Sequence, residues 1–385
     1  MINKNRLIKL TQNLIRIDSQ NPPGDESRIG LFVKNYLKNL GLKPKIYEFK
    51  KKRTNVIATL EGRNKKRALL LTPHLDTVPA GKDWQISPFS GRVFKGRIYG
   101  LGATDCKGNL ACALETINSL VEDRLILDYN LIFAATADEE CGSYLGLIPL
   151  LKKNILRPSQ AVVLDAENFS IIINQKGLLH LKIKIKGKRA HGAYPWRGIN
   201  AIDLAIEIIK EIKNYKFFKT NNPYLRGPTI NLGTIRGGDK VNIVADWCEF
   251  ELDFRFLPNE PIQKLLEEIK RILKKQTKNF FSKQNSQIEI PEIEIEGLQK
   301  PYEIDKNHPL INSLVKAMQK FKIKPKIKGS EGATVITFFQ DKGIPAVALG
   351  FGEEGCAHCT DEYIKIESLY KGAQVLEEFL RNHKF

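Results

Sequence analysis

Residues 131–141 read LIFAATADEEC, in which an uncharged apolar run leads into three consecutive carboxylates and a thiol. The apolar part is typical of a strand that is buried on both faces. Asp138, Glu139 and Glu140 follow where that strand would end, although adjacent like charges repel one another. The pattern indicates either a solvated turn or a reaction site, and the surrounding sequence must decide between them.

Further apolar strands alternate with helical patterns over the first 175 residues. Strands are predicted at 43–49, 55–62, 68–76 and 161–167, and helices at 5–17, 28–40 and 108–123. Continuous apolar strands separated by helices predict an α/β fold with a mostly parallel sheet flanked by helices. Ligands of such sheets bind beyond the carboxyl ends of the strands.

The pattern changes near residue 176, where apolar and basic residues begin to alternate with period two. Such strands, with one wet face, are predicted at 177–192, 229–238 and 242–258, and amphipathic helices at 199–215 and 260–276. A helix at 308–321 and an apolar strand at 343–352 then resume the first pattern. We therefore expect one α/β domain, 1–175 and 293–385, interrupted by a smaller α+β domain, 176–292. Residues 274–287 are the predicted mobile loop.

The bulk composition is that of an ordinary globular protein and does not favour a nucleic-acid or membrane protein. The net charge of +18 comes from 61 Lys and Arg against 43 Asp and Glu. These basic residues are scattered and accompany no nucleic-acid-binding motif, so nucleic-acid binding is an alternative that rests on charge alone. The N-terminus lacks a signal-peptide pattern, no apolar run reaches about 18 residues, and six cysteines are few. We expect a cytoplasmic protein with no membrane partner.

Nearly all residues that could bind a metal stand at the predicted strand ends. They are His74 with Asp76 two residues later, Asp105 after a glycine-rich turn, Glu139 and Glu140, Asp165 with Glu167 as an alternative, and His358. Each one alone is ordinary turn or surface chemistry. Together, at one edge of a sheet, a mixed nitrogen and oxygen set suits two divalent ions that share a carboxylate, as in two-metal hydrolases.

Several motifs give the chain a family resemblance. HLDTVPAG (74–81), GLGATDCKGNLA (100–111), TADEECGSYLG (136–146), HGAYPWRGINAI (191–202), HCTDE (358–362) and the early IDSQNPPGDE (17–26) occur in order. Over essentially its whole length the chain resembles the acetylornithine deacetylase, succinyl-diaminopimelate desuccinylase and carboxypeptidase G family of co-catalytic zinc hydrolases. The resemblance implies a zinc-exopeptidase-like catalytic domain and an inserted ferredoxin-like domain that serves as a lid or for dimerisation.

The resemblance also implies roles for the residues at the strand ends. Asp105 would bridge two divalent ions, with zinc expected and cobalt as the alternative. His74 and Asp165 would bind one ion, and Glu140 and His358 the other. Asp76 would orient His74. Glu139 would be the general base, which takes a proton from a metal-bridging water and passes it to the leaving amine.

Other roles implied by the resemblance fall in the inserted domain. His191 would stabilise the oxyanion, in dimeric relatives from the partner subunit, so a homodimer is expected here. Arg255 would hold a substrate carboxylate and Asn242 would also contact substrate. Residues 330–339, SEGATVITFF, lack the Asp of the usual Gly-Thr-Asp-Ala pattern.

The predicted function is hydrolysis of the amide bond of an N-acyl amino acid, such as succinyl-diaminopimelate or acetylornithine. A dipeptidase, aminopeptidase or carboxypeptidase acting on short peptides is the alternative within the class, and a non-catalytic binding module is the alternative outside it. Four cysteines lie beside the metal motifs: Cys106, Cys141, Cys356 and Cys359. We expect their thiols to pack around the site, and oxidation sensitivity is the alternative.

Overall fold

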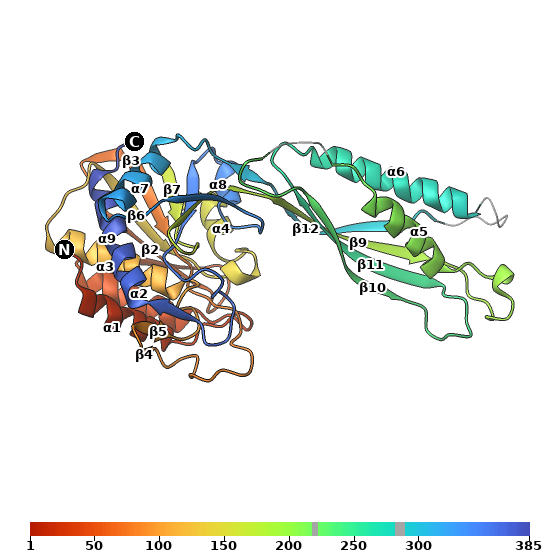
Figure 1. Ribbon diagram of the computed structural model, residues 1–385, viewed down its shortest axis with the longest axis horizontal. Helices are drawn as coiled ribbons and strands as arrows, with labels where there is room; N and C mark the ends of the chain where they lie inside the picture. Colours follow the sequence, from red (N-terminus) through yellow and green to blue (C-terminus); the bar gives the residue numbers. More distant parts are fainter. Residues whose placement is uncertain (218–221, 282–288) are drawn as a thin grey trace. The chain divides into compact units, whose positions relative to one another are not determined.

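The computed structural model describes residues 1–217, 222–281 and 289–385, and it divides into two compact units (Figure 1). Unit 1 comprises residues 1–173, 304–329 and 334–385, and unit 2 comprises 174–303 and 330–333. Among the described residues, no helix combines the length and the apolar composition needed to cross a membrane.

A mixed sheet has most of its strands in unit 1. Its strands, in spatial order, are β1 (Lys45–Glu48), β2 (Thr54–Leu60), β6 (Tyr129–Ala135), β3 (Asn64–Thr72), β7 (Gln160–Val163), β15 (Ala346–Leu349), β8 (Ser170–Gln175) and β13 (Tyr302–Glu303), with β14 (Lys326–Ser330) also beside β8. The four central strands β6, β3, β7 and β15 are parallel. Every residue of β7 and β15 is buried, as expected for strands covered on both faces.

Helices cover this sheet (Figure 1). They are α1 (Lys4–Ile15), α2 (Ser27–Asn39), α3 (Lys107–Glu122), α4 (Leu147–Lys152), α7 (Pro309–Lys320), α8 (Thr337–Gln340) and α9 (Ile366–Asn382). Helix α3 packs between α1 and α9 and is buried over nearly its whole length, which fits its weakly amphipathic sequence. A small second sheet joins β16 (Tyr363–Lys365), β5 (Arg97–Tyr99) and β4 (Arg92–Phe94).

Unit 2 has the chain order βαββαβ. Its elements are β9 (Gly177–Lys186), α5 (Ala201–Lys213), β10 (Thr229–Gly237), β11 (Trp247–Phe256), α6 (Ile262–Phe281) and β12 (Glu292–Gln299), and the antiparallel sheet has the order β10-β11-β9-β12. This is the ferredoxin-like arrangement. Alternate apolar residues of β9 and β11 pack with α5 and α6 in one core, and the charged residues between them face the other side.

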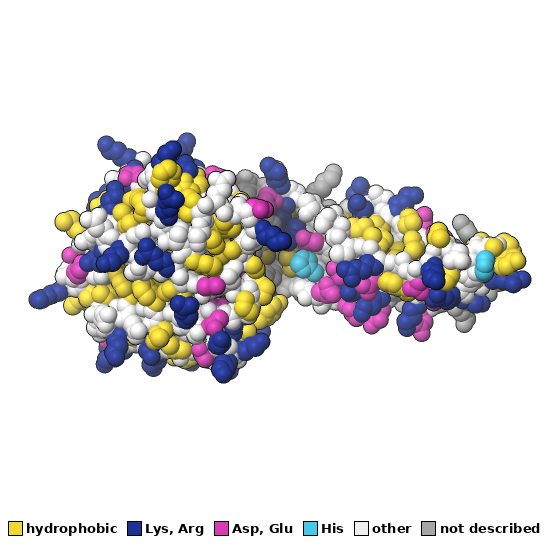
Figure 2. Space-filling view, turned by 90° about the horizontal axis from the view of Figure 1, so that it is seen from below, with side chains coloured by type: hydrophobic (Ala, Val, Ile, Leu, Met, Phe, Trp, Pro, Cys, Tyr) yellow, Lys and Arg dark blue, Asp and Glu magenta, His cyan; other side chains and the backbone are white. Residues whose placement is uncertain are grey.

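The opposite face of this sheet explains part of the basic composition. Lys182 pairs with Glu251 at 3.2 Å and Lys184 pairs with Glu294 at 2.5 Å, each across neighbouring strands. Figure 2 shows Lys and Arg side chains spread over the visible surface with Asp and Glu among them. Much of the positive charge is therefore interspersed with acidic side chains on solvated faces.

The predicted fold class, a largely parallel α/β sheet with a smaller α+β unit, is confirmed, and several predicted boundaries are wrong. The strand predicted over 242–258 begins at Trp247. The mobile loop predicted over 274–287 is wrong for 274–281, which continue α6 because Leu273, Thr277 and Phe281 bury one face of that helix. The rest of that predicted loop, 282–287, lies outside the described residues.

Candidate metal centre

Two parallel strands place a histidine and the acidic turn side by side. Beyond the last residues of β3 and β6 the chains still pair, since His74 and Thr136 form a bridge and the Leu75 N–H donates to the Thr136 carbonyl at 2.8 Å. The turn Glu139–Cys141 follows directly as a short 3-10 helix. The apolar strand thus carries ADEEC to the carboxyl edge of the sheet, where the sequence predicts a ligand site.

Asp105 lies between two histidines. Its Oδ1 is 2.8 Å from Nε2 of His74, and its Oδ2 is 3.2 Å from Nε2 of His358. The two oxygens of one carboxylate therefore face two different imidazoles, which is the geometry that a carboxylate shared by two metal ions requires.

Three overlapping groups of potential ligands meet at this edge: His74 with Asp105 and Cys106, His74 with Glu139 and Asp165, and Asp105 with Glu140 and His358. Within each group, ligand atoms lie within 4.8 Å of one another. His358 Nε2 is 3.2 Å from Glu140 Oε2, and His74 Nε2 is 3.9 Å from Asp165 Oδ1. The five residues predicted as ligands, and Glu139, all come together at this edge.

Asp76 contacts more of the site than the sequence predicts. His74 Nδ1 is 2.9 Å from the backbone oxygen of Asp76 and 3.7 Å from its carboxylate, so the backbone is the nearer partner of the ring. The two carboxylate oxygens instead accept the backbone N–H groups of Glu139 and Glu140, each at 3.1 Å. Asp76 therefore fixes the acidic turn as well as the histidine.

The structure distinguishes the two candidates for the fourth carboxylate. Asp165 lies in the group with His74, whereas the Glu167 carboxylate accepts the backbone N–H of Gly355 at 2.9 Å and that of Ala357 at 3.4 Å. Glu167 thus braces the loop that carries His358. This geometry supports Asp165 as the ligand.

The pKa values at this edge show crowded acids around protonated rings. Hydrogen bonds with Asp105 and Glu140 raise the pKa of His358 to about 11. Burial and the charge of Asp105 raise the pKa of Asp165 to about 7, and burial together with Asp165 raises the pKa of Glu139 well above its ordinary value. Divalent cations would relieve this repulsion and would replace the protons on the two rings.

The donors present fit divalent cations of the zinc type. Two imidazoles and several carboxylates form a mixed nitrogen and oxygen set, which zinc and cobalt accept. Among the described residues, Glu140 Oε1 is a buried oxygen without a hydrogen-bond partner, as a ligand atom would be before it binds an ion.

The four thiols near the motifs differ in exposure. Cys106 is buried, and its Sγ accepts the His74 N–H at 3.2 Å, in agreement with the predicted packing role. Cys356 is partly buried. The packing prediction is wrong for Cys141 and Cys359, which are exposed because the turn and loop that carry them lie at the surface.

The other predicted site residues belong to unit 2. Exposed His191 lies beside Asn242, since the Gly192 N–H donates to the Asn242 carbonyl at 2.8 Å. Nδ1 of His191 accepts the Ala193 N–H at 3.0 Å, so the neutral ring carries its hydrogen on Nε2. Arg255, one residue before the carboxyl end of β11, is paired with Asp253 at 2.8 Å. The guanidinium of Arg255 thus already has a carboxylate partner within its own strand.

Sequence reasoning missed one buried acid that shapes the site. The Glu362 carboxylate accepts the N–H groups of Gly102 at 2.7 Å, Thr104 at 2.7 Å and Asp105 at 2.9 Å. It therefore holds the loop that presents Asp105. The residue stands in the HCTDE motif, so its signal was present in the sequence, but its partners lie more than 250 residues away.

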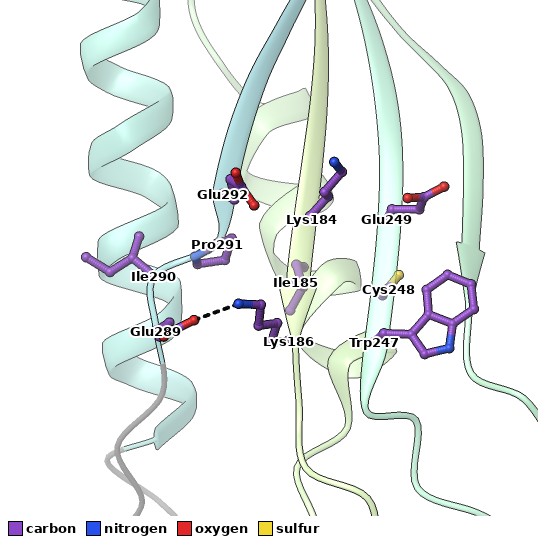
Figure 3. Close-up of a pocket in the computed structure, with 10 residues that line it drawn as sticks. All are labelled: Lys184, Ile185, Lys186, Trp247, Cys248, Glu249, Glu289, Ile290, Pro291 and Glu292. Carbon is purple, nitrogen blue, oxygen red and sulfur yellow. Dashed lines mark hydrogen bonds and ion pairs between the residues drawn. The ribbon is translucent and has the colours of Figure 1, made fainter.

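A separate cavity of about 530 Å³ lies in unit 2 where β12 meets β9 (Figure 3). Lys184, Lys186, Trp247 and Glu292 are among its lining residues, and Lys186 pairs with Glu289 at 3.1 Å beside it. None of the potential metal-ligand groups found among the described residues includes a residue of this cavity. Its charged side chains are those of the paired sheet face.

Comparisons with known proteins identify the family of the chain. Residues 70–382 match the model of peptidase family M20/M25/M40. The chain is 31% identical to an uncharacterised metallohydrolase of Methanocaldococcus jannaschii, with 97% of this chain and 98% of the relative covered. It is 28% identical to the acetylornithine deacetylase of Proteus mirabilis, with 98% and 95% covered.

Solved structures share the fold over nearly the whole chain. The crystal structure of a tripeptidase from Staphylococcus aureus superimposes with a TM-score of 0.81 at 27% identity, and the alignment covers 99% of this chain and 98% of that one. The similarity therefore spans both units.

Proposed function

We propose, from the premise that the chain belongs to peptidase family M20/M25/M40, that it hydrolyses the amide bond of an N-acyl amino acid with two divalent cations. Membership of this family makes the chain a metal-dependent hydrolase of amide or peptide bonds. One observation carries the proposal: Asp105 faces His74 with one oxygen and His358 with the other, and Glu139 lies beside them.

The residues of the carboxyl edge divide between two cation positions. His74 and Asp165 would hold one cation, Glu140 and His358 the other, and Asp105 would contact both. Zinc suits these donors, with cobalt as the alternative. When bound, the cations would polarise the amide carbonyl and lower the pKa of the attacking water.

Glu139 is proposed as the general base. It stands in the group with His74 and Asp165, and its backbone N–H is fixed by Asp76, so its carboxylate is placed beside the proposed cations and the water that they would activate. Glu139 takes a proton from the attacking water and delivers it to the leaving amine. Asp76 keeps both His74 and this turn in place.

His191 is proposed to stabilise the oxyanion, because Nδ1 accepts a backbone N–H and the neutral ring then donates from Nε2. Asn242, its neighbour, would contact substrate. Arg255 lies eight residues along β11 from Trp247, about 27 Å at a strand rise of about 3.4 Å per residue, and His191 pairs with Ile243, which precedes that strand at the Trp247 end. One copy of unit 2 cannot place both His191 and Arg255 on one small substrate. This supports a homodimer in which His191 reaches the partner's site, while Arg255 would need to exchange Asp253 for a substrate carboxylate.

The deacylase proposal is supported by the similarity to the acetylornithine deacetylase of Proteus mirabilis over nearly the whole chain. A peptidase is the second candidate, favoured by the similarity to the tripeptidase of Staphylococcus aureus. The same residues of the carboxyl edge could serve either reaction, since only the group beyond the scissile amide differs.

A substrate screen tests the proposal. The protein loaded with zinc, and separately with cobalt, is offered N-acetylornithine, N-succinyl-diaminopimelate, other N-acyl amino acids, dipeptides and tripeptides, with Glu139→Gln as the inactive control. We expect an N-acyl amino acid to have the highest kcat/KM. Preferred cleavage of peptides would replace the deacylase with the peptidase. Two bound ions without hydrolysis of any substrate would indicate a binding module.

A further inference from the structure

The first acid of the ADEEC turn and the early NPPGDE motif, residues 21–26, meet behind the metal centre. Asp138 has a left-handed backbone, with φ 66°, and forms an ion pair with Arg53 at 2.9 Å. Arg53 is also paired with Glu26, the last residue of the motif. Neither Asp138 nor Arg53 contributes an atom to the metal-ligand groups.

The Arg53 guanidinium is shared between two buried acids. Its Nε lies 2.8 Å from Oε2 of Glu26, and its Nη2 lies 2.7 Å from Oε1 of the same carboxylate. Exposure is 7% for Arg53, 0% for Glu26 and 4% for Asp138. A planar fork that bonds two carboxylates away from water fixes their relative positions, because each bond is charge-assisted and directional.

The rest of the motif is shaped around this guanidinium. Gly24 has φ 78°, and a Cβ there would lie 2.5 Å from Cζ of Arg53, so a larger residue would displace the guanidinium. Nδ2 of Asn21 donates to Asp76 Oδ2 at 2.9 Å and to Asp138 Oδ1 at 3.4 Å. The motif therefore joins the carboxylates on both sides of the acidic turn.

These contacts continue into the turn itself. Oδ2 of Asp138 accepts the N–H of Leu145 at 2.9 Å, which closes the loop after the turn, and Asp76 accepts the N–H groups of Glu139 and Glu140. The turn is thus held from one side by Asp76 and from the other by Asp138, and Arg53 and Asn21 connect the two supports.

We propose that Arg53, held by Glu26, is a positioning residue that acts through Asp138 to set the Glu139–Glu140 turn against the metal centre. The inference rests on the proposed roles of Glu139 as base and Glu140 as ligand. It gives the NPPGDE motif a function that does not involve contact with substrate. A purely structural ion pair would instead stabilise the fold without altering kcat or cation binding.

Variants of Arg53 separate these two roles. Arg53→Met removes the fork, and Arg53→Lys keeps the charge but can bond fewer oxygens at once. Arg63→Met is the matched control, because Arg63 pairs with Asp128 at 3.0 Å in an exposed ion pair. Cobalt binding is followed through visible absorption, and kcat and KM are measured on the substrate that the screen identifies.

Removing a residue that supports metal ligands from outside commonly lowers metal affinity or activity by about 10–100-fold. We expect Arg53→Met to lower kcat and to weaken one of the two cobalt sites by about this factor, with KM within about twofold of wild type. Arg53→Lys should recover part of the loss, and it replaces Arg53→Met if that variant does not fold. Arg63→Met should match wild type throughout.

The inference is overturned if folded Arg53→Lys and Arg53→Met keep wild-type kcat and two unaltered cobalt sites. It is also overturned if both lose only thermal stability. If the proposed function is wrong, the wild type would bind two cobalt ions without hydrolysing any substrate. The cobalt titration of the variants would still test the positioning role in that case.

Discussion

Two buried histidines at opposite ends of the parallel strands of unit 1 have opposite protonation behaviour. His74 follows the carboxyl end of β3, whereas His383 lies at the amino ends of β6 and β7, with Nε2 2.9 Å from the Oε1 of Gln160. Their exposure is almost equal, 2% and 3%. Yet the pKa of His74 is raised well above its ordinary value, and the pKa of His383 is lowered to about 4.

The neighbours of each ring explain the difference. Burial opposes a positive charge on both, but around His74 contacts with Cys106, Asp105 and Asp76 outweigh it. Around His383 the rings of Tyr129, Phe379 and Phe385 lie within 5.6 Å between centroids and offer no negative charge. Burial alone therefore does not make a histidine a metal ligand. The carboxylates at the carboxyl edge make His74 a candidate, whereas the aromatic rings around His383 make that residue part of the core.

The strongest challenge to this comparison is removal of the shared carboxylate. Asp105→Ala takes away the oxygens that face His74 and His358, so both cation positions lose a ligand. We expect bound metal and hydrolysis to fall to background together, measured by elemental analysis and turnover. Asp128→Ala, an exposed acid just before β6, should change neither. Two ions retained in Asp105→Ala would disprove the bridging role.

Substitutions of Glu139 and Glu140 should have smaller effects than Asp105→Ala, and they should distinguish the general base from a metal ligand. Glu139→Gln cannot accept a proton, and general-base catalysis contributes about 10²–10⁴-fold, so kcat should fall by that factor while two ions stay bound. Its neighbour is the matched comparison: Glu140→Gln should lose affinity for one ion. If Glu139→Gln loses an ion instead, its place beside His74 and Asp165 is that of a ligand.

A substitution that weakens the loop presenting Asp105, and leaves every proposed ligand in place, should lower metal affinity or kcat by a smaller factor. Glu362→Gln replaces one oxygen with an NH₂ group, which would oppose one of the N–H groups of Gly102, Thr104 and Asp105. We expect metal affinity or kcat to fall by about 10–100-fold. Glu367→Gln, an exposed acid of α9, is the control. Equal behaviour of the two variants would show that the Asp105 loop needs no such support.

The sequence predicts the ligands of this edge better than their supports, for a physical reason. The candidate ligands His74, Glu140 and Asp165 follow apolar strands whose carboxyl ends must meet, so the strand positions alone bring them together. Arg53 ends the run KKKR, residues 50–53, which has the pattern of solvated charge. Three of these residues are exposed and Arg53 alone is buried, a distinction that depends on Glu26 and Asp138 from distant parts of the chain.

The two histidines also show how far the sequence alone can predict a site. Only His74 has an acid two residues away. Period two along an extended segment places that acid on the same side and marks His74 as a candidate. The aromatic surroundings of His383 come from β6, α9 and the last residue, so its place in the core depends on tertiary packing.

The last predicted effect is on stability instead of activity; it concerns the amino end of the sheet and depends on pH. The pKa of His383 is about 4 in the folded state, below the ordinary value of 6.5, so between these values the unfolded chain binds a proton that the folded chain does not. The stability contributed by the neutral ring is therefore complete above pH 6.5 and decreases as the pH falls towards 4. At pH 5 the loss is about 2 kcal/mol, at about 1.36 kcal/mol per pKa unit.

His383→Gln cannot titrate and can still donate to Gln160. Urea unfolding at pH 7.5 and pH 5.0 should show that wild type loses about 2 kcal/mol more than this variant, because all other groups titrate alike in both. Equal losses would mean that the pKa of His383 in the folded state stays near its ordinary value, so that burial among aromatic rings does not lower it.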